Sequence, residues 1–222
     1  MDSFQKVRKD FDDIAVLDEG WTHNSFFYNF LNRHVPWNCI DILEVGCGLG
    51  EFTRIIALKS EHVLAVDLSP EMIRMANLNS TTFRNIDYRI ENILDYIWPE
   101  NHFDCIVSIA TLHHLPLAFM LEKMVFSIKP GGRLIILDML KAENLTDFLL
   151  GAVSFPLSRV MMLIKNGRLK EPEHIRRAWE EHGKNEIYMR FSELRRICNI
   201  HIPDAEIRRH LLWRYSIVWT KQ

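Results

Sequence analysis

The sequence predicts an α/β fold in which helices cover both faces of a doubly wound, mostly parallel sheet. Between residues 41 and 140, short apolar runs alternate with longer stretches of helical spacing. The runs are rich in β-branched and aliphatic residues, which is typical of strands buried on both sides. With 222 residues, 48% of them hydrophobic, the chain can fill one sizeable core, so we expect a single domain, residues 1–222.

The expected strands follow one another with helices between them. They are residues 41–45, 62–66, 86–90, 103–108 and 133–137. A helix is expected after the second strand, because Ser69 suits an N-cap, Pro70 suits the first helical position and Glu71 is acidic. The segment 129–132, with one proline and two glycines, is expected to end a helix and to turn into the fifth strand.

The C-terminal part of the chain is expected to complete the sheet. Residues 191–200 have the spacing of a helix, and two β-rich runs follow it, at 206–212 and 215–220. An antiparallel hairpin is the simplest arrangement of these runs. The sheet would then have seven strands, as in Rossmann-like folds.

Two segments lie outside the repeat of strands and helices. Residues 1–40 are rich in aromatic side chains, and we expect them to form a helical lid across the mouth of a pocket. Residues 141–190 are expected to add a second lid, with an apolar helix at 145–164 and a charged helix at 172–182. The chain is therefore predicted to consist of an N-terminal lid (1–40), a core (41–140), a helical insertion (141–190), and a C-terminal helix and hairpin (191–222).

Composition disfavours several classes of protein. A formal net charge of −2 lacks the basic character of a nucleic-acid-binding domain. The four cysteines form no C-x-x-C pair, which indicates neither a zinc site nor a disulfide framework, so a cytoplasmic protein is expected. The longest apolar stretch, residues 148–164, is interrupted by Pro156 and Arg159 and is shorter than the roughly 20 residues that span a bilayer. We therefore expect no contact with a membrane.

The sharpest feature is the segment 44–53, where a strand runs into a glycine-rich turn and then a helix. Gly46, Gly48 and Gly50 let a ligand approach the backbone closely, and the start of the helix faces that ligand. Asp67 ends the next strand about 20 residues further on, a spacing at which a carboxylate can hold ribose hydroxyls. Together these residues predict a nucleoside pocket.

Two acidic residues narrow the choice of nucleoside. In the dinucleotide fingerprint G-x-G-x-x-G the third glycine would fall at Glu51, whose charge would repel a pyrophosphate. Glu44, just ahead of the first glycine, suits a ligand with an amino group. S-adenosylmethionine carries an ammonium group, a ribose and a sulfonium, and it fits this chemistry.

Four motifs, taken in order, resemble those of class I S-adenosylmethionine-dependent methyltransferases of the small-molecule "type 11" group. They are LEVGCGLG at 43–50, AVDLSPEM at 65–72, FDCIVS with LHHL at 103–108 and 112–115, and IKPGGRL at 128–134. The resemblance covers residues 40–140. It implies S-adenosyl-L-methionine as cofactor and S-adenosyl-L-homocysteine as product.

The resemblance also implies how the donor is held. Asp67 would take both ribose hydroxyls, and Glu44 would orient the loop or meet the amino group through water. Asn92 would meet the adenine amino group, where the family more often has Asp. The other expected contacts are with the methionine and ribose portions (Gly46, Cys47, Gly48 and Gly50), the adenine (Leu68, Met72 and the backbone of Ile93) and the methyl-bearing sulfur (Ser108 and Ile109).

Methyl transfer from a sulfonium is an in-line displacement, so the enzyme chiefly aligns donor and acceptor and needs neither a metal nor a covalent nucleophile. A base is required only where the acceptor must lose a proton. His113 and His114 follow the fourth strand, and imidazole titrates near neutrality, so one of them is the candidate base. The alternative is that they cap the next helix and pack the loop. Asp138, after the fifth strand, could be the base, orient the histidine or cap a loop.

We expect a small-molecule acceptor that offers an oxygen, nitrogen or carbon nucleophile. The alternatives are a tRNA or protein methyltransferase, and a nucleoside-binding protein without catalysis. Amino-group methylation of nucleic acids or glutamine usually goes with Asn/Asp-Pro-Pro-Tyr/Phe after the fourth strand, and this chain has Ser108-Ile109-Ala110-Thr111 there. The donor motifs are undamaged, which favours catalysis.

Residues of the two lids are expected to determine the acceptor. Several N-terminal residues could close over the donor: Trp21, His23, Asn24 and Tyr28. A group in the apolar helix could form an adaptable wall for a hydrophobic acceptor, although packing of the helix explains the same pattern: Phe148, Phe155, Met161, Met162 and Leu163. His182 and Asn185 could reach the pocket edge. The arginines at 176–177, 208–209 and 214 are expected on solvated or ion-paired faces.

Overall fold

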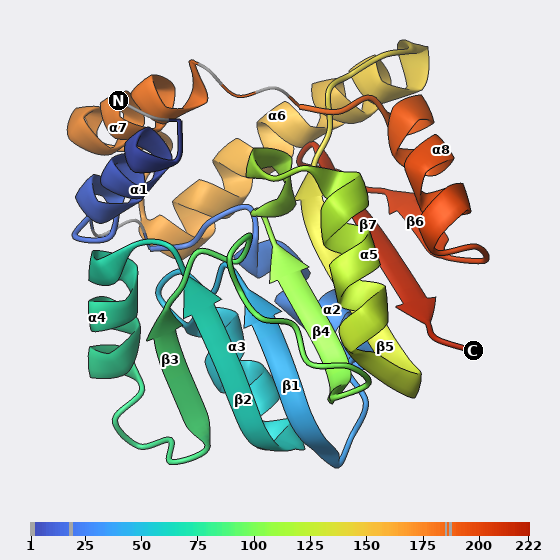
Figure 1. The fold of residues 1–222 in the computed structure, drawn as a ribbon. Coiled ribbons are helices and arrows are strands. Elements are labelled where there is room, and N and C mark those ends of the chain that lie inside the picture. The colour runs from blue at the N-terminus through green and yellow to red at the C-terminus, as the bar shows by residue number, and fades with distance from the viewer. Residues whose placement is uncertain (1–2, 18–19, 185, 187) are drawn as a thin grey trace.

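A seven-stranded sheet forms the centre of the computed structural model, which describes residues 3–17, 20–184, 186 and 188–222 (Figure 1). The strand order is β3-β2-β1-β4-β5-β7-β6. The first five strands are parallel: β1 (Cys39–Val45), β2 (Ser60–Asp67), β3 (Ile86–Ile90), β4 (Phe103–Ile109) and β5 (Ile128–Met139). The antiparallel pair is β6 (Glu206–Arg209) and β7 (Arg214–Thr220), and β7 pairs with β5. The predicted fold class is confirmed.

Helices cover both faces of this sheet. One face packs against α2 (Tyr28–His34), α3 (Glu51–Ile56) and α4 (Pro70–Asn79), and the other packs against α5 (Leu117–Ser127) and α8 (Phe191–His201). Neighbouring residues of β1 point to opposite faces, so that Ile42 joins the first layer and Leu43 joins the second. Both are fully buried, as expected of a parallel strand covered on both sides.

The predicted start of α4 is confirmed. The Ser69 hydroxyl accepts a hydrogen bond from the backbone N–H of Met72 at 3.0 Å, and Pro70 occupies the first helical turn. The prediction was wrong at the start of β5, because residues 129–132 lie inside that strand rather than in a turn before it. The pairing of β4 with β5 is irregular there, with a register shift between Phe103 and Cys105.

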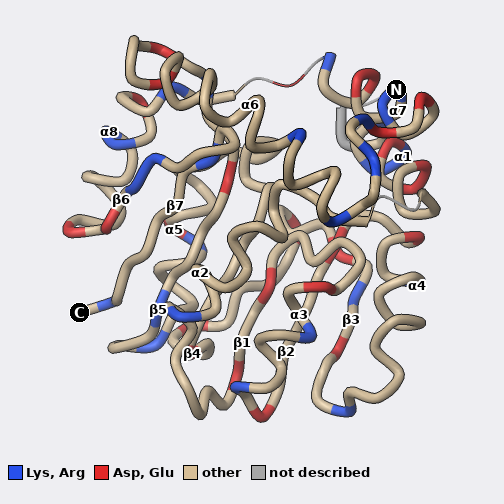
Figure 2. The backbone as a smooth tube through the Cα atoms, turned by 180° about the vertical axis from the view of Figure 1, so that it is seen from behind, with Lys and Arg blue, Asp and Glu red and all other residues tan. Residues whose placement is uncertain are grey.

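Three helices lie over the carboxyl ends of the parallel strands: α1 (Ser3–Ile14), α6 (Leu145–Asn166) and α7 (Glu173–Gly183). Figures 1 and 2 both place α1 beside α7, above α4. Short 3₁₀ turns complete the described chain at Ser25–Phe27, Ala57–Lys59 and Leu112–His114. In Figure 2, Lys and Arg alternate with Asp and Glu around the sheet, in line with the near-neutral net charge.

α6 is longer than the apolar stretch that the sequence analysis considered. It has 22 residues, and it is the one helix among the described residues that is long and apolar enough to cross a membrane. Only 17% of its most apolar part is buried inside the protein. The sequence argument that this segment is too short to span a bilayer is therefore corrected.

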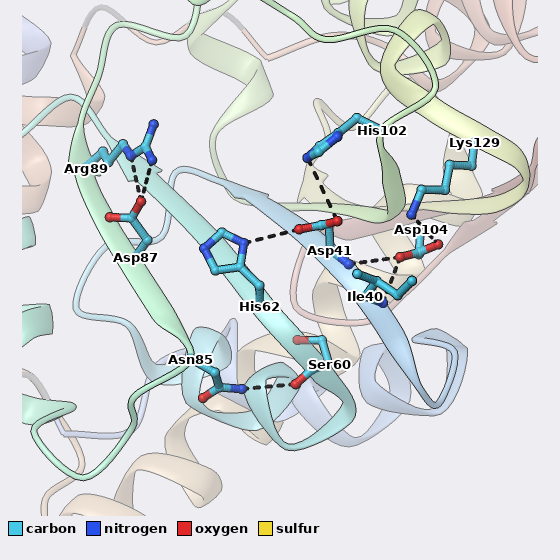
Figure 3. A network of polar contacts seen from close by, with 10 residues as sticks. All are labelled: Ile40, Asp41, Ser60, His62, Asn85, Asp87, Arg89, His102, Asp104 and Lys129. Atoms are coloured by element: carbon cyan, nitrogen blue, oxygen red, sulfur yellow. Dashed lines mark hydrogen bonds and ion pairs between the residues drawn. The ribbon is translucent and has the colours of Figure 1, made fainter.

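A polar network ties the strands together at their amino ends, on the opposite edge of the sheet (Figure 3). The Asp104 carboxylate accepts the backbone N–H groups of Ile40 and Asp41 at 2.8 and 2.9 Å and the ammonium of Lys129 at 2.9 Å. Burial acts to raise the pKa of Asp104, but these hydrogen bonds outweigh it and hold the pKa below its usual value. Through these contacts the Asp104 carboxylate of β4 connects β1 with β5 and aligns the three strands.

All four cysteines are buried, unpaired thiols: Cys39, Cys47, Cys105 and Cys198. Burial raises the pKa of each thiol, to about 11 for Cys39, to about 12 for Cys198 and well above the usual value for the other two. The thiols are therefore protonated and shielded at neutral pH.

Candidate active site

The parallel strands bring the predicted site residues to one edge of the sheet. Because β1, β2, β4 and β5 are parallel, their carboxyl ends meet there, and they carry Gly46, Asp67, Ile109 and Asp138. β1 lies between β2 and β4, and the helices that follow β1 and β4 pack on opposite faces. This is the point at which ligands bind in open α/β sheets.

The glycine-rich turn is held by backbone hydrogen bonds to β2. The N–H groups of Gly46 and Cys47 both donate to the carbonyl of Val66, at 2.9 and 3.0 Å. The N–H of Gly48 donates to one oxygen of the Asp67 carboxylate at 2.9 Å. The turn ends at Gly50, which is the N-cap of α3. The loop and the carboxylate that the sequence paired are thus in direct contact.

Two glycines of the turn are required for different reasons. A Cβ atom on Gly46 would lie 1.9 Å from the hydroxyl oxygen of Thr111, so glycine lets this loop touch the loop after β4. Gly48 has a φ of +52°, and no described atom lies within 4 Å of the place where its Cβ would be. The backbone at Gly48 therefore faces open space, which is where a ligand can approach it.

The Asp67 carboxylate is oriented for ligand binding. One oxygen accepts the N–H of Gly48, and the other accepts the N–H of Ser69 at 2.9 Å. Each oxygen keeps a further lone pair for a ribose hydroxyl. Burial raises the pKa of Asp67, and the backbone N–H donors oppose this rise.

Glu44 is buried at the end of β1. Its carboxylate accepts the hydroxyl of Thr53 at 2.5 Å, which connects the strand to α3. Burial raises the pKa of Glu44 to about 8, and the Thr53 hydrogen bond opposes this rise. A cationic ligand group nearby would favour the ionised form.

The other predicted donor residues lie at or near the same edge. Met72 is buried under Ile14, the last residue of α1, and Ala15, which follows it; Ile93 is buried in the layer that faces α5. The amide of Asn92 donates to Asp95 at 2.7 Å and accepts the backbone N–H of Leu94, so its carbonyl oxygen is already engaged.

Three further predicted residues face the interior of the fold. Cys47 and Ile109 pack into the apolar layer that faces α2 and α3. The Ser108 hydroxyl donates to the carbonyl of Val45 at 3.0 Å, across to β1. Leu68 lies half-buried beside Asp67. Ser108 therefore uses its hydroxyl to join two strands.

His113 and Asp138 form a buried pair. The imidazole Nδ1 of His113 lies 2.6 Å from one Asp138 oxygen, and the backbone N–H of His113 donates to the other at 2.9 Å. Both side chains are at least 95% buried. α5 has Pro116 as its N-cap and no side-chain cap, so the two histidines do not cap it. Of the three roles that the sequence offered for Asp138, its contacts fit two, because it orients the His113 ring and caps the loop at the His113 backbone.

Glu186 completes a cluster that the sequence analysis missed. Its carboxylate lies 3.2 Å from Nδ1 of His114 and 3.6 Å from Nε2 of both His113 and His182. Burial acts to raise the pKa of Glu186, but the hydrogen bond from His114 and the three imidazoles outweigh it and lower the pKa. His182 and Glu186 are four residues apart, but no spacing in the sequence connects them with His113 and His114. His182 does reach the site, whereas Asn185 lies outside the described residues.

The cluster has atoms that could coordinate a metal ion. His113, His114 and Glu186 each place one ligand atom within 4.8 Å of the others, and Nε2 of His114 is buried without a hydrogen-bond partner among the described residues. Two imidazoles and a carboxylate suit zinc and similar divalent ions. The Glu186 carboxylate also lies 3.2 Å from Nδ1 of His114 and 3.6 Å from Nε2 of His113, so the same groups can contact one another directly.

α1 and α7 cover this edge. Phe11 of α1 lies edge-on to His114 and His182, with ring centres 5.6 and 4.8 Å apart. Asp12 accepts the Ser69 hydroxyl at 2.6 Å, directly beside Asp67. Asp10 lies 3.3 Å from Nδ1 of His182. The cover over the donor residues is therefore α1 rather than the later part of the N-terminal segment.

The later part of the N-terminal segment, from His23 to Tyr28, packs against α6, β7 and α3. Asn24 accepts a hydrogen bond from Arg214 at 3.0 Å, His23 lies 2.7 Å from the Ser158 hydroxyl, and Tyr28 packs against Phe52. Burial, together with Arg214, lowers the pKa of His23 to about 4. These residues connect the N-terminal segment to α6, β7 and α3.

Two expectations about the rest of the chain were wrong. Arg214 is buried rather than solvated, since it begins β7 beside Asp138; burial lowers its pKa to about 10, and Asp138 opposes this. Phe148, Phe155 and Leu163 form neither a pocket wall nor a packed core, because all three are about half or more exposed to solvent. The outer arginines do pair with acidic residues, as Arg176 does with Glu180.

A cavity of about 120 Å³ opens beside His113. Its lining is mostly apolar: Leu112, His113, Leu115, Leu117, Met139, Met189 and Tyr215. A cavity lined mainly by apolar residues, with polar groups on two of them, His113 and Tyr215, is typical of a small-molecule site.

Comparison with known proteins agrees with this geometry. Residues 43–136 match the sequence profile of a methyltransferase domain. The ubiquinone biosynthesis O-methyltransferase of Xylella fastidiosa is 27% identical over 235 residues, which cover 96% of this chain and 88% of that protein. These matches and the geometry of the site identify the chain as an S-adenosylmethionine-dependent methyltransferase.

Further comparisons extend this result for the methyltransferase. The demethylmenaquinone methyltransferase of Tropheryma whipplei is 32% identical over 99 residues, which cover 44% of this chain and 41% of that protein. The N-methyltransferase NodS of Bradyrhizobium japonicum, in complex with S-adenosyl-L-homocysteine, has the same fold, with a TM-score of 0.59 and 17% identity over the whole of this chain and 99% of its own. A methyltransferase of Aquifex aeolicus gives a TM-score of 0.59 at 18% identity, with full coverage of both chains.

The residues present fit S-adenosylmethionine. Gly48 leaves its backbone open, Asp67 has lone pairs for the ribose, and Glu44 is a buried carboxylate beside the same turn. None of these three requires a phosphate partner. The methyltransferase would hold the donor with the end of β1, the end of β2 and the glycine turn.

Proposed function

We propose that this methyltransferase transfers the methyl group to a hydroxyl oxygen of an apolar small molecule. The observation that carries the proposal is the His113–Asp138 pair, in which a buried carboxylate holds Nδ1 of an imidazole at 2.6 Å. With the proton on Nδ1, the other nitrogen is free to act as a base. A hydroxyl acceptor needs such a base, because the oxygen must lose its proton as it attacks.

The bound donor supplies an electrophilic methyl group on a sulfonium, whose sulfur leaves as a neutral thioether. His113 would take the hydroxyl proton on Nε2 while the oxygen forms its bond to the methyl carbon. Asp138 would stabilise the resulting imidazolium, and Glu186, 3.6 Å from Nε2, provides a second carboxylate that could receive the proton. Alignment over the carboxyl ends of β1 and β4 would supply the rest of the rate.

Two further observations support this proposal. The cavity beside His113 is lined mainly by leucine, methionine and tyrosine, so it suits an apolar acceptor. The Xylella relative, which matches along nearly the whole chain, is named an O-methyltransferase. The alternative of a tRNA or protein acceptor gains no support from the relatives named above. We also propose a cytoplasmic location, which the four buried, unpaired thiols support.

The test is turnover with labelled S-adenosylmethionine and an alkyl-substituted catechol as acceptor. Replacing a general base costs about 10²–10⁴-fold in kcat, so His113→Asn should fall in that range while affinity for S-adenosylhomocysteine stays within about twofold. His102→Asn, at the amino end of β4, is the matched control and should keep full turnover. Methylation of an alkylamine but not the catechol would contradict the proposal, as would full activity of His113→Asn.

A further inference from the structure

The outward face of α6 is almost entirely apolar. Eight of its large side chains are 48–73% exposed: Leu145, Phe148, Leu149, Val153, Phe155, Val160, Leu163 and Ile164. No charged side chain is exposed between Leu145 and Ile164. The two charged residues in that stretch are partly buried and engaged: the Asp147 side chain is 10% exposed and pairs with Arg209 at 3.1 Å, and Arg159 stacks on Phe155. A continuous exposed apolar surface of this kind marks an interaction site.

The inward face of α6 carries polar side chains that hydrogen-bond to the rest of the fold, next to the buried Met162. The Ser154 hydroxyl donates to Leu150 at 2.6 Å and accepts the backbone N–H of Leu212 at 2.7 Å. Ser158 lies 2.7 Å from a ring nitrogen of His23, and Asn166 accepts the N–H of Trp21 at 2.7 Å. A helix on the surface of a soluble protein turns its apolar side inward. α6 has the reverse orientation, and its buried hydrogen bonds fix that orientation.

Charge at one end of α6 indicates what covers this face. Lys165 and Lys170, at and just beyond its carboxyl end, are exposed and form no ion pair with any described residue. Trp213, at the turn between β6 and β7, is 40% exposed next to Gly151. Apolar side chains flanked by lysines and a tryptophan are typical of a helix that lies in the interface of a membrane with anionic lipids.

We propose that the outward face of α6 lies on an anionic lipid bilayer, parallel to its surface. The helix is long enough to cross a membrane, but crossing would break the hydrogen bonds of Ser154, Ser158 and Asn166 to the rest of the fold. Binding in the plane of the interface keeps all of them. This interpretation replaces the expectation that the protein makes no membrane contact.

The position of α6 would let the membrane deliver the acceptor to the active site, an inference that rests on the proposed function. α6 begins six residues after the end of β5, whose Asp138 belongs to the catalytic pair. An acceptor dissolved in the bilayer would therefore meet the protein close to the apolar cavity beside His113. An apolar acceptor concentrated in the membrane would not need to cross water to reach the site.

The experiment is co-sedimentation of the full chain with large vesicles of phosphatidylcholine and phosphatidylglycerol in equal parts. We expect the protein to bind, and Val160→Asp to weaken the partition coefficient at least tenfold, because it places a charge in the apolar face. Leu58→Asp is the matched control: Leu58 is 72% exposed in the turn before β2, on the opposite edge of the sheet, and its variant should bind like the wild type. Affinity for S-adenosylhomocysteine, measured on each variant, shows that it is folded.

A second pair of measurements tests the lipid charge. The wild-type protein should bind vesicles of phosphatidylcholine alone more weakly than anionic vesicles, by about fivefold for each lysine that loses its anionic partner. The double variant Lys165→Glu/Lys170→Glu should lose affinity for anionic vesicles by at least the same factor for each lysine. The proposal is overturned if the wild type stays in solution with anionic vesicles, or if Leu58→Asp loses as much binding as Val160→Asp. It is also overturned if the wild type is a dimer without lipid and Val160→Asp is a monomer, since the face would then meet a second copy. Vesicle binding requires neither donor nor acceptor, so a failure of the proposed methyl transfer would be seen separately.

Discussion

The substitution Gly48→Ala tests whether the open side of the glycine turn holds the donor. In the free protein the new methyl group would meet no described atom within 4 Å, so packing is unaffected. The remaining cost is the left-handed backbone at φ +52°, which is about 1–2 kcal/mol for a residue with a Cβ. For a chain of this size that corresponds to a fall in Tm of about 2–8 °C.

The bound state should be affected much more. A ligand in contact with the Gly48 backbone would have to move by about 1.5 Å, the length of one carbon–carbon bond. Overpacking of this size costs about 1–3 kcal/mol, which corresponds to a Kd about 5–150 times higher. Calorimetric titration with S-adenosylhomocysteine measures this change directly.

Gly131→Ala is a matched control for backbone strain. Gly131 has a φ of +78°, a Cβ there would also meet nothing within 4 Å, and it lies near the start of β5, on the edge of the sheet away from the site. It should lose a similar amount of Tm and keep its affinity. Binding by Gly48→Ala within twofold of the wild type would refute the reasoning, and so would an equal loss of affinity in Gly131→Ala.

Three further predictions concern the carboxylates and the histidine cluster. Asp67→Ala should weaken binding of S-adenosylhomocysteine at least tenfold in calorimetry, because one charge-assisted hydrogen bond contributes about 1.5–3 kcal/mol; unchanged affinity would remove Asp67 from the donor site. The pKa of Glu44 is raised to about 8, so native protein binds a proton that the unfolded chain has released, and stability should fall as pH rises from about 4.5 to 8. Thermal unfolding of Glu44→Gln over this range should show a flatter pH dependence, and an unaltered slope would contradict the assignment. Treatment with a chelator should leave turnover unchanged, because methyl transfer from a sulfonium needs no metal; lost activity restored by zinc would instead identify a metal site at His113, His114 and Glu186.

The donor half of the site could be predicted from the sequence because its determinants are local. A strand, a glycine turn and a helix start follow one another at residues 44–53, and Asp67 ends the strand that pairs with it. Because the strands are parallel, their carboxyl ends meet at one edge of the sheet, so the positions of the strands in the sequence are enough to predict the site. The register of β5 was less predictable, because its irregular start at 129–132 depends on pairing with β4.

The histidine cluster could not be predicted because it is assembled from distant segments. His182 lies in the last turn of α7 and Glu186 follows that helix, while Asp10 and Phe11 lie on α1, and packing of α1 against α7 brings them to His114. Neither periodicity nor spacing encodes such a contact. Arg214 illustrates the same limit, since a charged residue at the start of a strand gives no sign that it will be buried opposite Met139, close to Asp138.

The orientation of α6 had a signal that hydropathy alone does not contain. An average over the helix reports how apolar it is, but not which side faces the protein. Ser154 and Ser158 are four residues apart, so they lie on one side of a helix, and this polar stripe is the buried side in the structure. The spacing of the few polar residues within an apolar helix would therefore have indicated its outward face.

The four shielded thiols make the protein a convenient background for site-specific labelling. A maleimide reacts with thiolate, and Cys39, Cys47, Cys105 and Cys198 are both buried and protonated at neutral pH. A single cysteine introduced at an exposed position of α6, such as Val160, would thus be the one reactive site without removal of any native cysteine. A polarity-sensitive dye attached there would report in real time whether that surface leaves water.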